Sequence, residues 1–138
     1  MRNVVLSAGM LLATLGVVAV VAYADHDEDE RVEKLMEKTH EGKRSPYRQL
    51  RAQSEAAAPA WPVVAATLPR FEEMSRALLE SPDADVKGSA DGYVDAVREV
   101  AAAAGKRDAA ALRVAFQSLT QSCGDCHFKG GVGGELDD

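Results

Sequence analysis

The sequence is poor in aromatic residues, which make up only 5% of its 138 positions. A core with so few aromatic rings must be built from small aliphatic side chains or be completed by a buried cofactor. Signals for β-structure are also missing. There is no sustained alternation of apolar and polar residues and no Asn-Gly turn between such runs. The chain therefore predicts an all-α protein.

The sequence also lacks an excess of positive charge. Its formal net charge is -6, whereas proteins that bind nucleic acids need Lys and Arg side chains to neutralise phosphates. The composition therefore excludes nucleic acid as a partner and leaves protein partners open. The length of the chain is that of one domain.

Long apolar runs are absent except at the N-terminus. A basic residue precedes an apolar run over residues 4–22, and Ala22 and Ala24 supply the small residues of a cleavage site. This pattern predicts a secretory signal peptide over residues 1–24 and a mature domain over residues 25–138. The run is close to the ~20 residues that span a bilayer, so an uncleaved membrane anchor is the alternative. In either case the domain is expected in the periplasm.

The rest of the chain has helical periodicity. Apolar residues recurring every three or four positions predict helices over residues 28–42, 60–79, 89–104 and 108–128. A short extra helix is expected over residues 46–54, a kink at Pro69, and a loop over residues 81–88. Four amphipathic helices that bury their apolar faces together predict an antiparallel four-helix bundle.

Cysteine is scarce, and both copies belong to one motif, Cys123-Gly124-Asp125-Cys126-His127. Cys-x-x-Cys-His is the attachment motif of c-type haem. Two thiols three residues apart lie on one side of a helical turn, where they can bond two neighbouring vinyl groups. The next residue, His127, then places an imidazole under the iron. The motif predicts one covalently bound haem c near the C-terminus of the last helix.

Three other interpretations of the two cysteines remain. A thioredoxin-like redox pair belongs at the N-terminus of a helix that follows a strand. A structural disulfide is the second alternative. A zinc site needs four ligands, and the only further histidines are His26 and His40.

With this motif on the last helix, the chain resembles the class II c-type cytochromes, which include cytochrome c′ and the low-spin cytochrome c-556 group. The resemblance implies that the first helix crosses the other face of the haem. Low-spin members supply a methionine from a segment similar to Lys34-Leu35-Met36-Glu37. It therefore implies Met36 as the sixth iron ligand, with His40, one turn later, as its rival.

The resemblance implies two classes of function. A haem with His and Met ligands implies transfer of single electrons between redox partner proteins. An open sixth position implies binding of NO or CO, as in cytochromes c′. Turnover of peroxide or nitric oxide would need a distal polar group such as His40, and enzymatic activity is not expected. Related bundles often dimerise, which leaves a homodimer open, and membrane contact is expected only through an uncleaved N-terminal segment.

Overall fold

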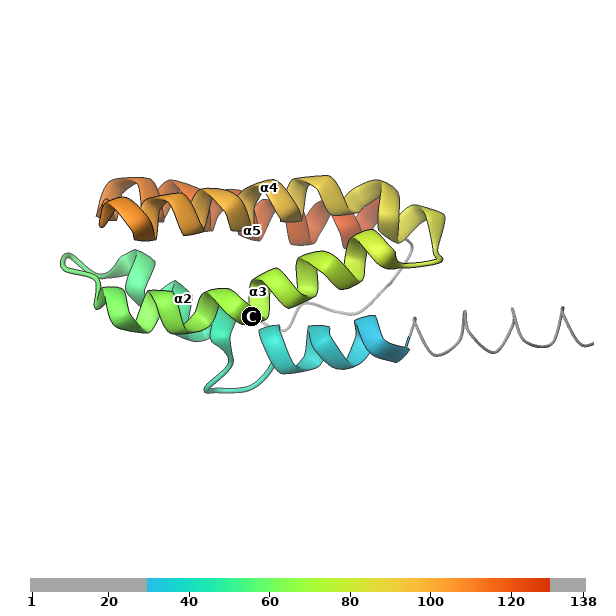
Figure 1. The fold of residues 1–138 in the computed structure, drawn as a ribbon, viewed down its shortest axis with the longest axis horizontal. Helices are drawn as coiled ribbons and strands as arrows, with labels where there is room; N and C mark the ends of the chain where they lie inside the picture. Colours follow the sequence, from blue (N-terminus) through green and yellow to red (C-terminus); the bar gives the residue numbers. More distant parts are fainter. Residues whose placement is uncertain (1–29, 130–138) are drawn as a thin grey trace, which may run out of the picture.

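A computed structural model describes residues 30–129 of the chain. This part consists of helices joined by short connections and contains no strand (Figure 1). The first helical segment, called the N-terminal helix below, covers residues 30–40. The following helices are α2 (Pro46–Glu55), α3 (Trp61–Glu80), α4 (Ala84–Lys106) and α5 (Ala109–Lys129). The predicted all-α class is confirmed, whereas the predicted signal peptide lies outside the described residues.

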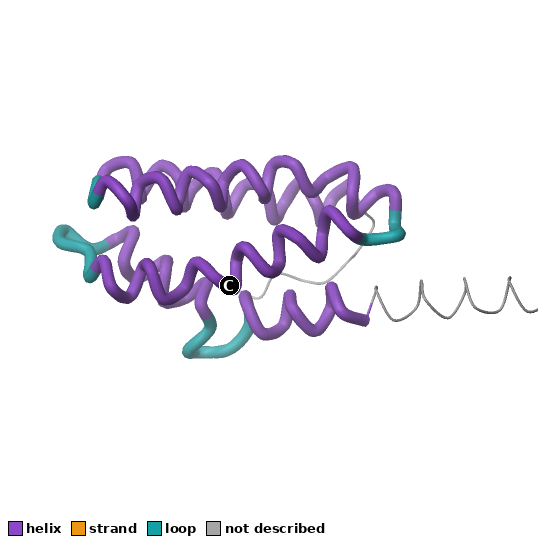
Figure 2. The backbone as a smooth tube through the Cα atoms, in the orientation of Figure 1, coloured by secondary structure: helices purple, strands orange, loops and turns teal. Residues whose placement is uncertain are grey.

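The helices form a four-rod antiparallel bundle whose first rod is broken. Figures 1 and 2 show the N-terminal helix and α2 following one another on the side of the molecule opposite α4 and α5. Gly42 has a positive φ of 86°, which ends the N-terminal helix. Ser45 then caps α2 by accepting a hydrogen bond from the Arg48 N–H, and Pro46 occupies the first turn. The predicted short extra helix is therefore half of a rod.

The predicted loop over residues 81–88 is wrong in its second half, because α4 already includes Gly88. The Asp83 carboxylate accepts hydrogen bonds from the backbone N–H groups of Asp85, at 2.8 Å, and Val86, at 3.2 Å. This N-cap satisfies donors that the first turn of a helix leaves without partners. The cap starts the helix earlier than its apolar pattern indicates.

Helix α3 runs through Pro69, which is exposed. A proline inside a helix removes one backbone hydrogen bond and bends the axis. Figure 1 shows α3 changing direction about halfway along its length, in agreement with the predicted kink.

The core lies where the four rods meet. Its largest fully buried side chains are Phe71, Leu50, Met74, Leu112, Leu119, Val64, Val100 and Thr39. Many other core positions are small, including the buried Ala90, Ala96, Ala103 and Ala115 of α4 and α5. Small residues let these two helices pack closely, and α4 contacts both α3 and α5.

We expect Leu50→Ala to lower the free energy of unfolding by about 2–5 kcal/mol, because this fully buried side chain would leave a cavity. Leu79→Ala is the matched control, since Leu79 is 38% exposed, and its effect should stay within about 1 kcal/mol. Urea unfolding followed by circular dichroism measures both. Equal effects would show that α2 is not packed into the bundle.

Candidate functional site

The structure brings three of the four predicted site residues to one cleft. Cys126 and His127, near the C-terminal end of α5, line a cleft of about 780 Å³. Met36 of the N-terminal helix lines the same cleft. Cys123, one turn before Cys126, is half-buried and is not among the cleft-lining residues. Two segments that lie far apart in the sequence therefore form one site.

The cleft suits a large apolar group. Its size falls within the ~300–1,000 Å³ typical of ligand pockets. Val32, Leu78 and Val86 contribute apolar side chains from the N-terminal helix, the end of α3 and the start of α4. The donor set of two thiols and an imidazole, next to apolar walls, fits a covalently attached haem.

The two thiols have different surroundings. The Ser89 hydroxyl of α4 donates a hydrogen bond to the Cys126 sulfur over 3.3 Å. The Cys123 thiol donates to the backbone carbonyl of Leu119, also over 3.3 Å. Burial, reinforced by the nearby Cys126, raises the pKa of the Cys123 thiol to about 11. Cys123 is therefore protonated and neutral at pH 7.

This environment disfavours the thioredoxin-like interpretation. Redox-active cysteines have a lowered thiol pKa and lie at helix N-termini, whereas the motif here lies near the C-terminal end of α5 and the pKa of Cys123 is raised. Between residues 30 and 129, moreover, no group of three or more His, Cys, Asp and Glu side chains is placed to hold a metal ion.

His40 lies in an aromatic cluster. Its ring centroid is 5.6 Å from that of Tyr47, 5.9 Å from that of Phe71 and 5.9 Å from that of Tyr93. The Nε2 atom of His40 is 3.4 Å from the Tyr93 hydroxyl oxygen. His40 is not among the residues that line the cleft, whereas Met36 is.

The His40 imidazole is held neutral. Its pKa is lowered from 6.5 to about 4, mainly by burial and to a smaller extent by the nearby His127, against the opposing effect of the Met36 backbone carbonyl. Burial also raises the pKa of the Tyr93 hydroxyl, and the neighbouring Cys123 adds to this effect. Tyr93 therefore lies within electrostatic reach of Cys123 while its hydroxyl contacts His40.

Sequence reasoning did not assign a site role to Ser89 or Tyr93. Both lie on α4, and they meet Cys126 and His40 only because of the way the helices pack. No local motif marks either residue. The only available signal was the helical periodicity that places Tyr93 on the apolar face of its helix.

The borders of the cleft carry mostly negative charge. Among the described residues, Lys34 is the only lysine or arginine in its lining, and it forms an ion pair with Glu30. The other charged residues besides His127 are carboxylates, namely Glu33, Glu37, Glu41 and Asp83. The three glutamates lie four residues apart, on one face of the N-terminal helix and its end.

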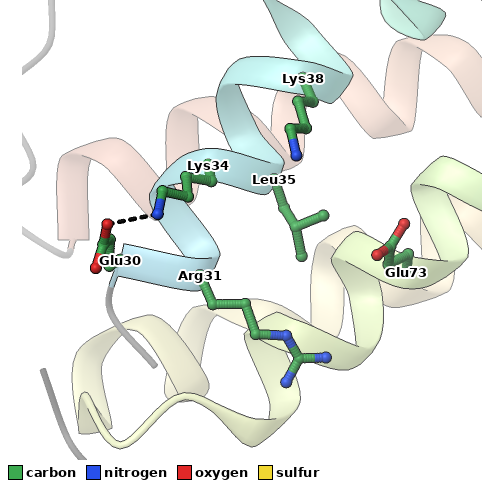
Figure 3. Close-up of a pocket in the computed structure, with 6 residues that line it drawn as sticks. All are labelled: Glu30, Arg31, Lys34, Leu35, Lys38 and Glu73. Atoms are coloured by element: carbon green, nitrogen blue, oxygen red, sulfur yellow. Dashed lines mark hydrogen bonds and ion pairs between the residues drawn. The ribbon is translucent and has the colours of Figure 1, made fainter. Parts of the chain in front are cut away.

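A smaller pocket of about 280 Å³ lies between the N-terminal helix and α3 (Figure 3). Leu35 and Lys38 line it together with Glu73 of α3. Its other lining residues include Arg31, which forms an exposed ion pair with Glu80. It contains none of the predicted site residues.

Comparison with known proteins identifies one family. A family model described as Cytochrome C′ matches residues 30–129. No curated protein and no solved structure gives a significant match. None of the helices within residues 30–129 has the length and apolar character needed to span a membrane.

The neutral state of His40 predicts a pH dependence. Unfolding returns the pKa of His40 from about 4 to 6.5, so between these pH values the unfolded chain binds more protons than the folded protein. The free energy of unfolding therefore keeps its full value above pH 6.5 and falls as the pH is lowered towards 4. The full loss is at most ~3 kcal/mol. We expect His40→Gln, which is neutral at every pH, to lose less stability over this interval. Urea midpoints between pH 4 and pH 7 measure the difference, and parallel profiles would contradict burial of a neutral imidazole.

Proposed function

Because the chain belongs to the Cytochrome C′ family and is therefore a haem protein, we propose that it carries single electrons through one haem c bound by His127 and Met36. The observation that supports this proposal is the shared cleft. Met36 and His127 lie near opposite ends of the described sequence, yet both line the same largely apolar cleft. A thioether and an imidazole facing one cleft are the ligand pair of a low-spin haem.

Each residue has a distinct role in this proposal. Cys123 and Cys126 would hold the haem through thioether bonds, and His127 and Met36 would be the ligands of its iron. When bound, the haem supplies a one-electron Fe(III)/Fe(II) couple. Methionine and histidine ligation raises the reduction potential of that couple. The apolar side chains of Val32, Leu78 and Val86 limit the access of water.

The partner and the location follow from charge and from the N-terminus. Carboxylates at the cleft favour a redox partner protein whose docking surface is positively charged. Opposite charges on the two surfaces attract the partners and orient them as they meet. On the basis of the signal peptide predicted over residues 1–24, we propose that the domain lies in the periplasm, free or anchored. Electron transfer requires no substrate chemistry, so the proposal assigns the protein no enzymatic activity.

A second function, binding of NO or CO to a high-spin haem, is favoured by the match to the Cytochrome C′ family. In this alternative Met36 does not bind the iron. The apolar cleft beside it then accepts a small neutral gas. The two functions differ in one observable, which is occupation of the sixth position by Met36.

Replacement of Met36 by leucine tests the ligand directly. Met36→Leu keeps the side-chain volume but removes the sulfur, so we expect a high-spin spectrum, loss of the methionine–iron near-infrared band and at least about tenfold tighter CO binding. Met74→Leu is the matched control, because Met74 is fully buried in the core and does not line the cleft. A wild-type protein that is already high-spin and binds CO would instead establish the gas-binding function.

The cysteines are tested by the covalent state of the haem. We expect the Cys123→Ser/Cys126→Ser double variant to lose haem on denaturation, because a non-covalent haem dissociates once the bundle unfolds. Each single variant should keep one thioether bond. Haem staining and the intact mass of the denatured protein measure attachment. Haem that stays on the denatured double variant would contradict attachment through these thiols.

A further inference from the structure

Tyr93 connects the two sides of the haem site. It is buried on α4, with only 4% of its surface exposed. Its hydroxyl oxygen is 3.4 Å from the His40 Nε2 atom at the end of the N-terminal helix. It also lies within electrostatic reach of Cys123 on α5. One side chain of α4, the helix that packs against α5 and its cysteines, thus contacts the helix that carries the methionine.

The Tyr93 hydroxyl is the hydrogen-bond partner of the His40 ring at Nε2, and the tautomer of the ring decides which of the two groups donates. The other ring nitrogen, Nδ1, is buried and has no hydrogen-bond partner among the described residues. Loss of the Tyr93 hydroxyl therefore removes the hydrogen bond that ties this ring to α4.

The Tyr93–His40 contact adds a directional restraint to the packing of the N-terminal helix. Its ion pair between Arg31 and Glu80 is exposed, and exposed ion pairs contribute little. Its buried side chains, Leu35 and Thr39, pack against the core, but apolar packing is weakly directional. A hydrogen bond is directional and opposes sliding or rotation of the helix on α4.

Met36 and His40 are four residues apart and lie on the same side of the helix. A small rotation of the helix therefore moves both side chains together. Holding His40 against α4 determines where Met36 lies in the cleft opposite His127. Met36 lies in the cleft, whereas His40 lies in the neighbouring aromatic cluster.

We infer that Tyr93 is a positioning residue for the sixth ligand: its hydrogen bond to His40 holds the N-terminal helix so that the Met36 sulfur faces the iron. The inference rests on the proposed function. In this inference Tyr93 and His40 do not bind the iron themselves. Their hydrogen bond raises the fraction of molecules in which Met36 is bound to the iron.

The test compares two tyrosines that both pack against His40. In Tyr93→Phe the hydrogen-bond partner of His40 is lost. The control is Tyr47→Phe. The Tyr47 ring also packs against His40, but its hydroxyl lies 3.3 Å from the Thr120 hydroxyl. The measurements on the holoprotein are CO affinity, the methionine–iron band and the thermal midpoint. We expect Tyr93→Phe to bind CO about fivefold more tightly, the effect of one net hydrogen bond, and to weaken the band. Tyr47→Phe should leave both unchanged.

A second pair of variants shows whether the effect passes through His40. In a His40→Phe background, Tyr93→Phe should add nothing to CO affinity, because the hydrogen bond is already absent. His40→Gln places an amide near the original Nε2 position and should restore wild-type CO affinity. A Tyr93→Phe effect of equal size in the His40→Phe background would overturn the inference.

The outcomes separate the inference from the proposed function. If Met36→Leu opens the iron while Tyr93→Phe matches the wild type, the positioning role is wrong and electron transfer through Met36 stands. If Met36→Leu itself changes neither the band nor CO affinity, the ligand assignment is wrong, and the inference falls with it. A lowered thermal midpoint in Tyr93→Phe with unchanged CO affinity marks a structural role only and also overturns the inference.

Discussion

The packing of α4 against α5 is the constraint on which the site depends. Small buried residues such as Ala96 and Ala115 line these helices and let their backbones approach. This approach brings Ser89 within 3.3 Å of the Cys126 sulfur. The attachment motif is thus held by a neighbouring helix as well as by its own.

The second constraint is the break in the first rod. Because the chain turns at Gly42, the N-terminal helix ends just before it and takes a direction separate from that of α2, although His40 still contacts Tyr47 of α2. Its inner side chains, Leu35 and Thr39, join the core, while Val32 and Met36 line the cleft. One short helix therefore contributes both to the bundle and to the wall of the cleft. In the inference above, the contact of His40 at its end sets the position of Met36 in that wall.

The interior of the site keeps its polar groups neutral, and its border carries charge. Burial holds His40 unprotonated and Cys123 protonated, because the charged forms lose solvation there. Carboxylates such as Glu37 and Asp83 gather at the cleft. A neutral interior next to a charged border is compatible with the proposed redox group and with the proposed docking of a partner protein at the cleft.

The sequence by itself determined the all-α class and the approximate helices, and it predicted the chemistry of Cys123, Cys126 and His127, because helical periodicity and motif spacing are local properties. Tertiary structure decided what depends on neighbours from other helices. Met36 and His40 lie one turn apart on the same face, so periodicity cannot distinguish them. Only packing places the first in the cleft and the second against Tyr93.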